Sequence, residues 1–159
     1  ISMKKILMFS SVLAIVVGSL MVAGGVWGIV FTYNNIAREN ITTPADASIP
    51  NVPVRGPLTL KSQADIIRFH TLRITKGETY SQMPQKVSKL DSNGNPILDD
   101  KGAIVMVPND ARNIWVTATT LTTALNLGII TYVFSALVVC FGTVSVWTGL
   151  IFLALKRRL

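Results

Sequence analysis

Two long segments without a charged residue bracket this chain, one from Ile6 to Tyr33 and the other from Asn113 to Leu155. A helix needs about 20 apolar residues to cross a bilayer core of about 30 Å, so each segment is long enough to span a membrane. We therefore expect a mainly α membrane protein in which two transmembrane helices form a hairpin. The residues between them are expected to form a small α+β domain outside the membrane.

Basic residues without acidic neighbours flank both segments and predict the orientation of the chain. Short flanks rich in Lys and Arg stay on the cytoplasmic side of a membrane. Residues 1–5 and 156–159 are therefore expected to be cytoplasmic, and residues 34–131 to be exported across a bacterial inner (plasma) membrane. The same basic side chains are expected to contact anionic lipid of the inner leaflet. They are Lys4, Lys5, Lys156, Arg157 and Arg158.

The beginning of the chain also has the pattern of a secretory signal, because Lys4 and Lys5 precede an apolar run. The apolar region of such a signal is usually about 7 to 15 residues long. Here it continues much further, to Tyr33, and Met21 stands where a cleavage site requires a small residue. We therefore expect an anchor helix that is not cleaved.

The net charge of +7 raises the question of a nucleic-acid partner, but the charges are distributed against one. Five of the 15 basic residues are at the two ends, and the other ten lie between Arg38 and Arg112 among all 8 acidic residues. A nucleic-acid surface gathers Lys and Arg on one face. We expect no nucleic-acid partner.

Small residues recur at seven-residue spacing in both apolar segments. This spacing places them on one face of a helix, where they let two backbones approach closely. The pattern predicts tight helix packing, and it leaves open whether the two helices pack on each other or on a partner. The residues at this spacing are Ser11, Gly18 and Gly25 in the first segment, and Gly128, Ser135, Gly142 and Gly149 in the second. Gly24 and Gly28 in the first segment form a further pair of small residues, four positions apart, with the same expected role.

Aromatic residues indicate the depth of each helix, because Trp and Tyr concentrate at membrane interfaces. Trp27 and Tyr132 both lie just beyond the point that about 20 residues, counted outward from the basic ends, would reach. We therefore expect transmembrane helices at 6–33 and 132–155, with residues 113–131 extending the second helix outside the membrane. Apolar residues at helical spacing in this extension are expected to form an interface. They are Ile114, Ala118, Leu121 and Leu125.

The exported domain is expected to cover residues 34–112. Residues 43–57 contain four of the seven prolines and predict an extended connector. Ser62 to Asp65 resembles a capping box and predicts the start of a short helix that ends near Gly77. The buried face of this helix is expected to contain Ile66, Ile67, Phe69 and Leu72.

A small β-hairpin is expected in the last part of the exported domain. Residues 91–95 and 99–102 are rich in Asp, Asn and Gly, which favour turns. They flank two short apolar runs, 96–98 and 103–107, which we interpret as the strands.

Three motifs could carry chemistry, and each can be discounted. Asp91, Asn93 and Asn95 begin like a calcium-binding loop, but Pro96 and Gly102 stand where that loop needs Gly and Glu. His70 is the only histidine, and a metal site seldom has one histidine alone. Residues 40–42 match a glycosylation acceptor, which is meaningful only in a glycosylating secretory pathway. We therefore expect no enzyme activity and no catalytic, cofactor or metal site.

Several segments resemble a family of small actinobacterial two-pass membrane proteins that often carry the label of an aromatic ring-opening dioxygenase. The resemblance lies in residues 37–42 (ARENIT), 56–59 (GPLT), 63–67 (QADII) with His70, and 77–80 (GETY), whereas residues 86–109 look like an insertion. The label does not suit this chain, because a non-haem iron oxygenase needs two His and a carboxylate. Such proteins are similar to accessory subunits of actinobacterial respiratory complexes.

Two functions follow from these patterns. The first is a non-catalytic accessory or assembly subunit of an inner-membrane complex, for which the resemblance implies the supercomplex of cytochrome bc complex and cytochrome oxidase. Helix packing and contacts of the exported domain would join it to integral membrane subunits. The alternative is an independent envelope sensor, or a ligand-binding regulatory protein, which would need a pocket in the exported domain.

Overall fold

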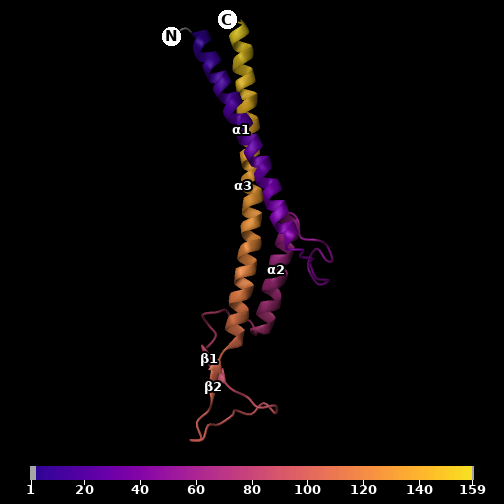
Figure 1. The fold of residues 1–159 in the computed structure, drawn as a ribbon, viewed down its shortest axis with the longest axis vertical. Helices are drawn as coiled ribbons and strands as arrows, with labels where there is room; N and C mark the ends of the chain where they lie inside the picture. Colours follow the sequence, from indigo (N-terminus) through magenta and orange to yellow (C-terminus); the bar gives the residue numbers. More distant parts are fainter. Residues whose placement is uncertain (1–2, 159) are drawn as a thin grey trace.

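The computed structural model describes residues 3–158, and in it the chain is elongated and mostly helical (Figure 1). In chain order, the elements are α1 (Met3–Arg38), α2 (Pro57–Ile74), β1 (Lys86–Ser88), β2 (Met106–Pro108) and α3 (Asp110–Arg158). Helices α1 and α3 are both long and apolar enough to cross a membrane. The strands form a small antiparallel pair in which Val87 lies opposite Val107.

Helices α1 and α3 pack against each other in opposite directions, so the two ends of the chain lie at the same end of the molecule (Figure 1). The contact brings the basic ends together, since Lys156 Nζ lies 2.9 Å from Met8 Sδ. Helix α3 is continuous, so the segments 113–131 and 132–155 are parts of one helix. Asn109 caps its start, because its Oδ1 accepts a hydrogen bond from the backbone N of Ala111 at 3.1 Å.

Helix α2 starts earlier than the sequence indicated, at Pro57. Proline suits the first position of a helix because it lacks an N–H that would have no partner there. Thr59 completes the cap, since its Oγ1 accepts hydrogen bonds from the backbone N of Arg55 and Gly56. The prediction that Ser62 begins the helix is therefore wrong, and Ser62 lies buried within it.

Helix α2 packs against α3. Ile66 is 7% exposed, as expected, but Phe69 is 53% exposed, so its place in the predicted buried face is wrong. Leu60 and Ala64 enter the core instead. After the helix, Gly77 adopts a φ of +85° and its N donates to the Leu72 carbonyl at 2.7 Å, which closes the last turn.

The segment between α1 and α2 is folded, which corrects the predicted extended connector. Thr42 pairs with Pro53 in an isolated bridge, and the backbone N of Thr43 donates to the Val52 carbonyl at 3.0 Å. Thr43 and Val54 are almost completely buried. Residues 39–56 thus form a closed loop at the end of α1, and we call this segment the capping loop.

The segment from β1 to β2 forms an arm at the end of the molecule opposite the chain termini (Figure 1). The predicted hairpin is confirmed in part, because Leu98 pairs with Ile104 in an isolated bridge and the backbone N of Val105 donates to the Ile97 carbonyl at 2.9 Å. The continuous paired strands are 86–88 and 106–108, and the prediction missed the first of them. Two similar turns lie between them. Asp91 Oδ1 accepts from the backbone N of Asn93 and Asn95, and Asp99 Oδ1 accepts from Lys101 and Ala103 in the same way.

Candidate functional site

The contact between α1 and α3 is built from layers of small residues, and we call it the seam. Ser11 faces Gly149, Gly18 faces Gly142, and Gly25 faces Ser135. Successive layers are seven residues apart in both helices. This regular spacing keeps small side chains on the facing sides of two helices that wind gently around each other.

Backbone meets backbone at the centre of the seam. A Cβ atom added to Gly18 would lie 2.6 Å from the Gly142 carbonyl oxygen, and one added to Gly142 would lie 2.7 Å from the Gly18 carbonyl oxygen. Both distances are shorter than a real Cβ contact. Only glycine therefore fits at these two positions without moving the helices apart.

Two serine hydroxyls connect the helices within the seam. Ser11 Oγ donates to the Gly149 carbonyl at 2.7 Å, and Ser145 Oγ donates to the Ala14 carbonyl at 2.9 Å. Such bonds satisfy a polar group that would otherwise face an apolar surrounding, and they fix the register of one helix against the other.

The remaining small residues differ in their positions. Gly24 lies outside the seam, because a Cβ added there would meet no atom within 4 Å. The prediction is wrong at Gly24 because it is one residue, or about 100° of helix rotation, from Gly25. Gly28 faces Ser135, whereas Gly128 lies closest to Leu60 of α2. Thr32 was not predicted, yet it is 6% exposed and continues the step of seven from Gly25.

The predicted interface on the first part of α3 is divided between covered and uncovered residues. Ala118 and Leu125 are buried, and Leu125 belongs to the core cluster formed with α2. Ile114 and Leu121 are 39% and 49% exposed. Each precedes a buried residue by four positions, which turns it by about 40° toward the edge of the packed face.

Arg55 joins the capping loop to both long helices. Its Nη1 donates to the Ala37 carbonyl at 3.1 Å, which supplies a partner for a carbonyl at the end of α1. Its own carbonyl oxygen accepts a hydrogen bond from Tyr132 Oη at 2.6 Å. No local sequence pattern indicated this connection, because the two residues are far apart in the chain.

A cavity of about 520 Å³ opens where α1 ends and α2 packs against α3. Buried Leu60 and Leu125 lie at its floor, and half-buried isoleucines form the walls. Exposed Asn35 and Glu39 stand at the rim. Nothing in the sequence had indicated such a pocket. Its full lining is Asn35, Ile36, Glu39, Ile41, Leu60, Gln63, Ile67, Leu121, Ala124 and Leu125.

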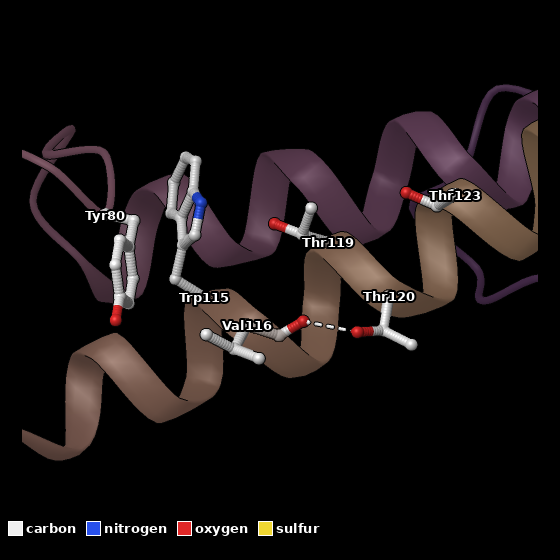
Figure 2. Close-up of a pocket in the computed structure, with 6 residues that line it drawn as sticks. All are labelled: Tyr80, Trp115, Val116, Thr119, Thr120 and Thr123. Atoms are coloured by element: carbon white, nitrogen blue, oxygen red, sulfur yellow. Dashed lines mark hydrogen bonds between the residues drawn. The ribbon is translucent and has the colours of Figure 1, made fainter.

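A second hollow of about 470 Å³ lies along the outer side of α3. Figure 2 shows the rings of Tyr80 and Trp115 at one end and threonines following along the helix. The guanidinium of Arg112 stacks 3.9 Å from the centre of the Tyr80 ring, and its Nη1 donates to the Met83 carbonyl at 2.6 Å. The Thr120 hydroxyl donates to the Val116 carbonyl in its own helix. We call this surface the threonine groove.

The residues considered for metal chemistry have other partners. His70 Nε2 lies 2.6 Å from Asp46 Oδ2, and this hydrogen bond lowers the pKa of Asp46 below its ordinary value. Backbone N–H groups that donate hydrogen bonds to the Asp91 carboxylate lower its pKa, and the N–H of Asn95 has the largest effect. Within residues 3–158, no three His, Cys, Asp or Glu side chains form a group that could hold a metal ion. Cys140 is exposed on α3.

Comparisons with protein-family models, with curated proteins and with solved structures found no match to this chain.

Proposed function

We propose that this chain is a two-pass protein of a bacterial plasma membrane that acts by binding, as an accessory or assembly subunit of a membrane complex. In this proposal both termini are cytoplasmic and residues 34–131 are exported. The adjacent basic ends of α1 and α3 support the orientation, since Lys and Arg flanks stay on the cytoplasmic side. They also provide one cluster of positive charge for anionic lipid.

The uncovered side of α3 is the observation that carries the proposed function. The small residues of the seam are taken up by the contact between α1 and α3. Helix α2 covers one face of the first part of α3. The other face leaves Val116 50%, Leu127 57% and Ile130 61% exposed. A helix face with this many apolar side chains next to the threonine groove suits a contact with another protein.

The partner class comes from the sequence resemblance described above. We propose integral membrane subunits of a respiratory supercomplex, composed of a cytochrome bc complex and a cytochrome oxidase. This chain would contribute contacts and no redox centre. The role of this chain would be structural, and the redox chemistry of the complex would belong to the partner subunits.

Affinity purification in a mild detergent, through a tag on the C-terminus, tests the proposal. We expect membrane subunits with haem absorbance to co-purify and to be identified by mass spectrometry. The double variant Val116→Glu with Leu127→Glu should reduce co-purification at least tenfold, while Ala45→Glu in the exposed part of the capping loop should not. Recovery of the chain alone, with its own fold intact, would contradict a role as a subunit.

The orientation has its own experiment. In a variant carrying Cys140→Ser and Ser92→Cys, a thiol reagent that does not cross membranes should label intact cells. Labelling that requires permeabilised cells would place the arm in the cytoplasm and overturn the proposed orientation.

A second candidate function is a ligand-binding or sensing protein of the envelope. The cavity beside α1 favours it, because its volume of about 520 Å³ is within the range of about 300–1,000 Å³ that is typical of small-molecule sites. A sensor should fold and bind its ligand after purification without any partner, which distinguishes it from an obligatory subunit.

A further inference from the structure

The contact between α1 and α3 ends before α3 does. Helix α1 stops at Arg38, and the last residue in the α3 step of seven that it reaches is Gly128, where an added Cβ atom would lie 3.6 Å from Ile36 Cδ1. On α3 the step of seven continues past Gly128 to Leu121 and Ile114. Residues at this step lie on one side of a helix. The side of α3 that meets α1 in the seam is therefore still apolar beyond the end of α1.

Helix α2 provides a second apolar row beside this one. Leu60 is buried close to Gly128, and Ile67 and Ile74 follow it at steps of seven. Ile67 and Leu121 line the same cavity, whereas Ile74 and Leu121 are exposed. Side chains of α1, α2 and α3 meet at Gly128, but α1 does not continue beyond it. Within residues 3–158, no third helix covers the two rows.

The cavity at the end of α1 also contains an amide without a partner. Gln63 belongs to its lining, and Gln63 Oε1 is buried and accepts no hydrogen bond from residues 3–158. Buried polar groups in folded proteins nearly always have a partner. Asn35 lies at the rim, where its Nδ2 uses one N–H for the Phe31 carbonyl and keeps the other. The two amides can thus both donate to and accept from polar groups of a protein partner.

Glu39 gives the cavity its charge. It is the one ionisable side chain among the described residues of the lining. The Glu39 side chain is exposed, and it forms no ion pair with any other residue in the range 3–158. A partner that carries Lys or Arg at this position would complement the carboxylate.

We propose that a helix from the exported part of a partner membrane subunit packs against α2 and α3, in line with α1. Its apolar side chains would enter the cavity and cover Ile67, Leu121 and Ile114, and a Lys or Arg at its end nearest α1 would pair with Glu39. Rows of apolar residues at steps of seven on two neighbouring helices match the side chains of a third helix. In the proposed placement the whole cavity lies outside the membrane, so the partner helix is an exported one.

The inference rests on the proposed function, and site-specific photocrosslinking tests it in the assembled complex. A benzophenone amino acid replaces Leu121 or Ile74, which are both exposed, in the tagged full-length chain. The cells that contain its natural partners are irradiated, the complex is purified in a mild detergent, and crosslinked peptides are identified by mass spectrometry. We expect both positions to crosslink to one peptide of a co-purifying membrane subunit. This peptide should have apolar residues at helical spacing and a Lys or Arg near one end.

Thr123 is the matched control, because it is exposed and lies two residues from Leu121, on the opposite side of α3. The benzophenone amino acid at Thr123 should not crosslink to the same peptide. Purification of the chain without any membrane subunit would contradict the proposed function, and the inference with it. If subunits co-purify, three results would overturn the inference alone: no crosslink from Leu121 and Ile74, a crosslink to a second copy of this chain, or the same peptide from Thr123.

A charge substitution tests the orientation of the partner helix. Glu39→Gln should lower the yield of the crosslink from Leu121 by about two- to fivefold, the scale of an exposed ion pair. Asp100→Asn removes one negative charge from the arm, away from the cavity, and should leave this yield unchanged. Equal yields in Glu39→Gln and in the chain with Glu39 would overturn the assignment of a basic residue beside the end of α1.

Discussion

The hydroxyl of Tyr132 donates a hydrogen bond of 2.6 Å to the carbonyl of Arg55, whose guanidinium in turn holds the Ala37 carbonyl at the end of α1. One arginine thus links the capping loop to α1 through its side chain and to α3 through its backbone. Tyr132 is only 9% exposed and belongs to the core cluster with Val54 and Leu60. The place where the seam ends is therefore fixed by polar bonds as well as by apolar packing.

Removing the hydroxyl in Tyr132→Phe should loosen this junction. A typical hydrogen bond contributes about 0.5–1.5 kcal/mol, and the substitution leaves the buried ring in place. We expect faster hydrogen exchange of the amides of Thr43 and Val54 in the capping loop, measured by mass spectrometry, with no change at the seam. Tyr33→Phe is the matched control, because the Tyr33 ring is 47% exposed. Unchanged exchange in Tyr132→Phe would show that the apolar core alone holds the loop.

Larger side chains at the centre of the seam should separate the long helices. We expect Gly18→Leu or Gly142→Leu to destabilise the protein by at least the 1–3 kcal/mol that is typical of overpacking, because each new side chain meets backbone atoms. Gly24→Leu should have little effect, since no atom lies within 4 Å of its added Cβ. Thermal unfolding in detergent compares the three variants. Equal loss of stability in all three would contradict the assigned seam.

The serine hydroxyl at the first layer of the seam should contribute modestly. Ser11→Ala removes the bond to the Gly149 carbonyl without adding volume, and hydrogen bonds between membrane helices contribute about 0.6 kcal/mol on average. We expect a small fall in unfolding temperature, which is absent in Ser19→Ala on the exposed side of α1. A stabilising effect of Ser11→Ala would show that burial of the hydroxyl outweighs its hydrogen bond.

The pair of Asp46 and His70 should make the capping loop sensitive to acid. Since the bond to His70 lowers the pKa of Asp46 below 3.8, this carboxylate stabilises the fold above that value, and its contribution is lost as the pH falls through the lower folded pKa. We expect carbon NMR of the Asp46 carboxyl to show a titration midpoint below 3.8 that rises in His70→Gln. A midpoint that does not respond to this substitution would assign the shift to another group.

Sequence patterns predicted the seam better than the domain between the helices. The step of seven from Ser11 to Gly18 and Gly25 is visible because glycine is rare enough to stand out, and in the structure all three pack against α3. Thr32 continues the step but was missed, since threonine in a helix commonly bonds the backbone of its own helix, as Thr32 does with the Gly28 carbonyl. Whether the helices would pair with each other could not be read from spacing alone, which is the same for an internal and an external partner.

Errors in the segment between α1 and α3 have identifiable local causes. The Ser62 pattern looked like a cap, but Pro57 and Thr59 supply a better one five residues earlier, and the added residues bring Leu60 into the buried face. Prolines in the capping loop suggested an extended chain, whereas hydrogen bonds between Thr43 and Val52 close it. The cavity depends on where three helices converge, and no single segment of the sequence encodes that position.

In the proposed membrane placement, the unbroken course of α3 sets the distance between the arm and the membrane. Its 49 residues correspond to about 70 Å of helix, of which the part from Asp110 to Tyr132 accounts for about 33 Å. The β1–β2 arm is attached directly to the start of this helix and cannot move closer to the membrane unless the helix bends. Any protein that binds the arm must therefore present its site at this height. Deleting one helical turn between Ala111 and Thr117 would shift the arm by about 5 Å while leaving every residue of the seam unchanged.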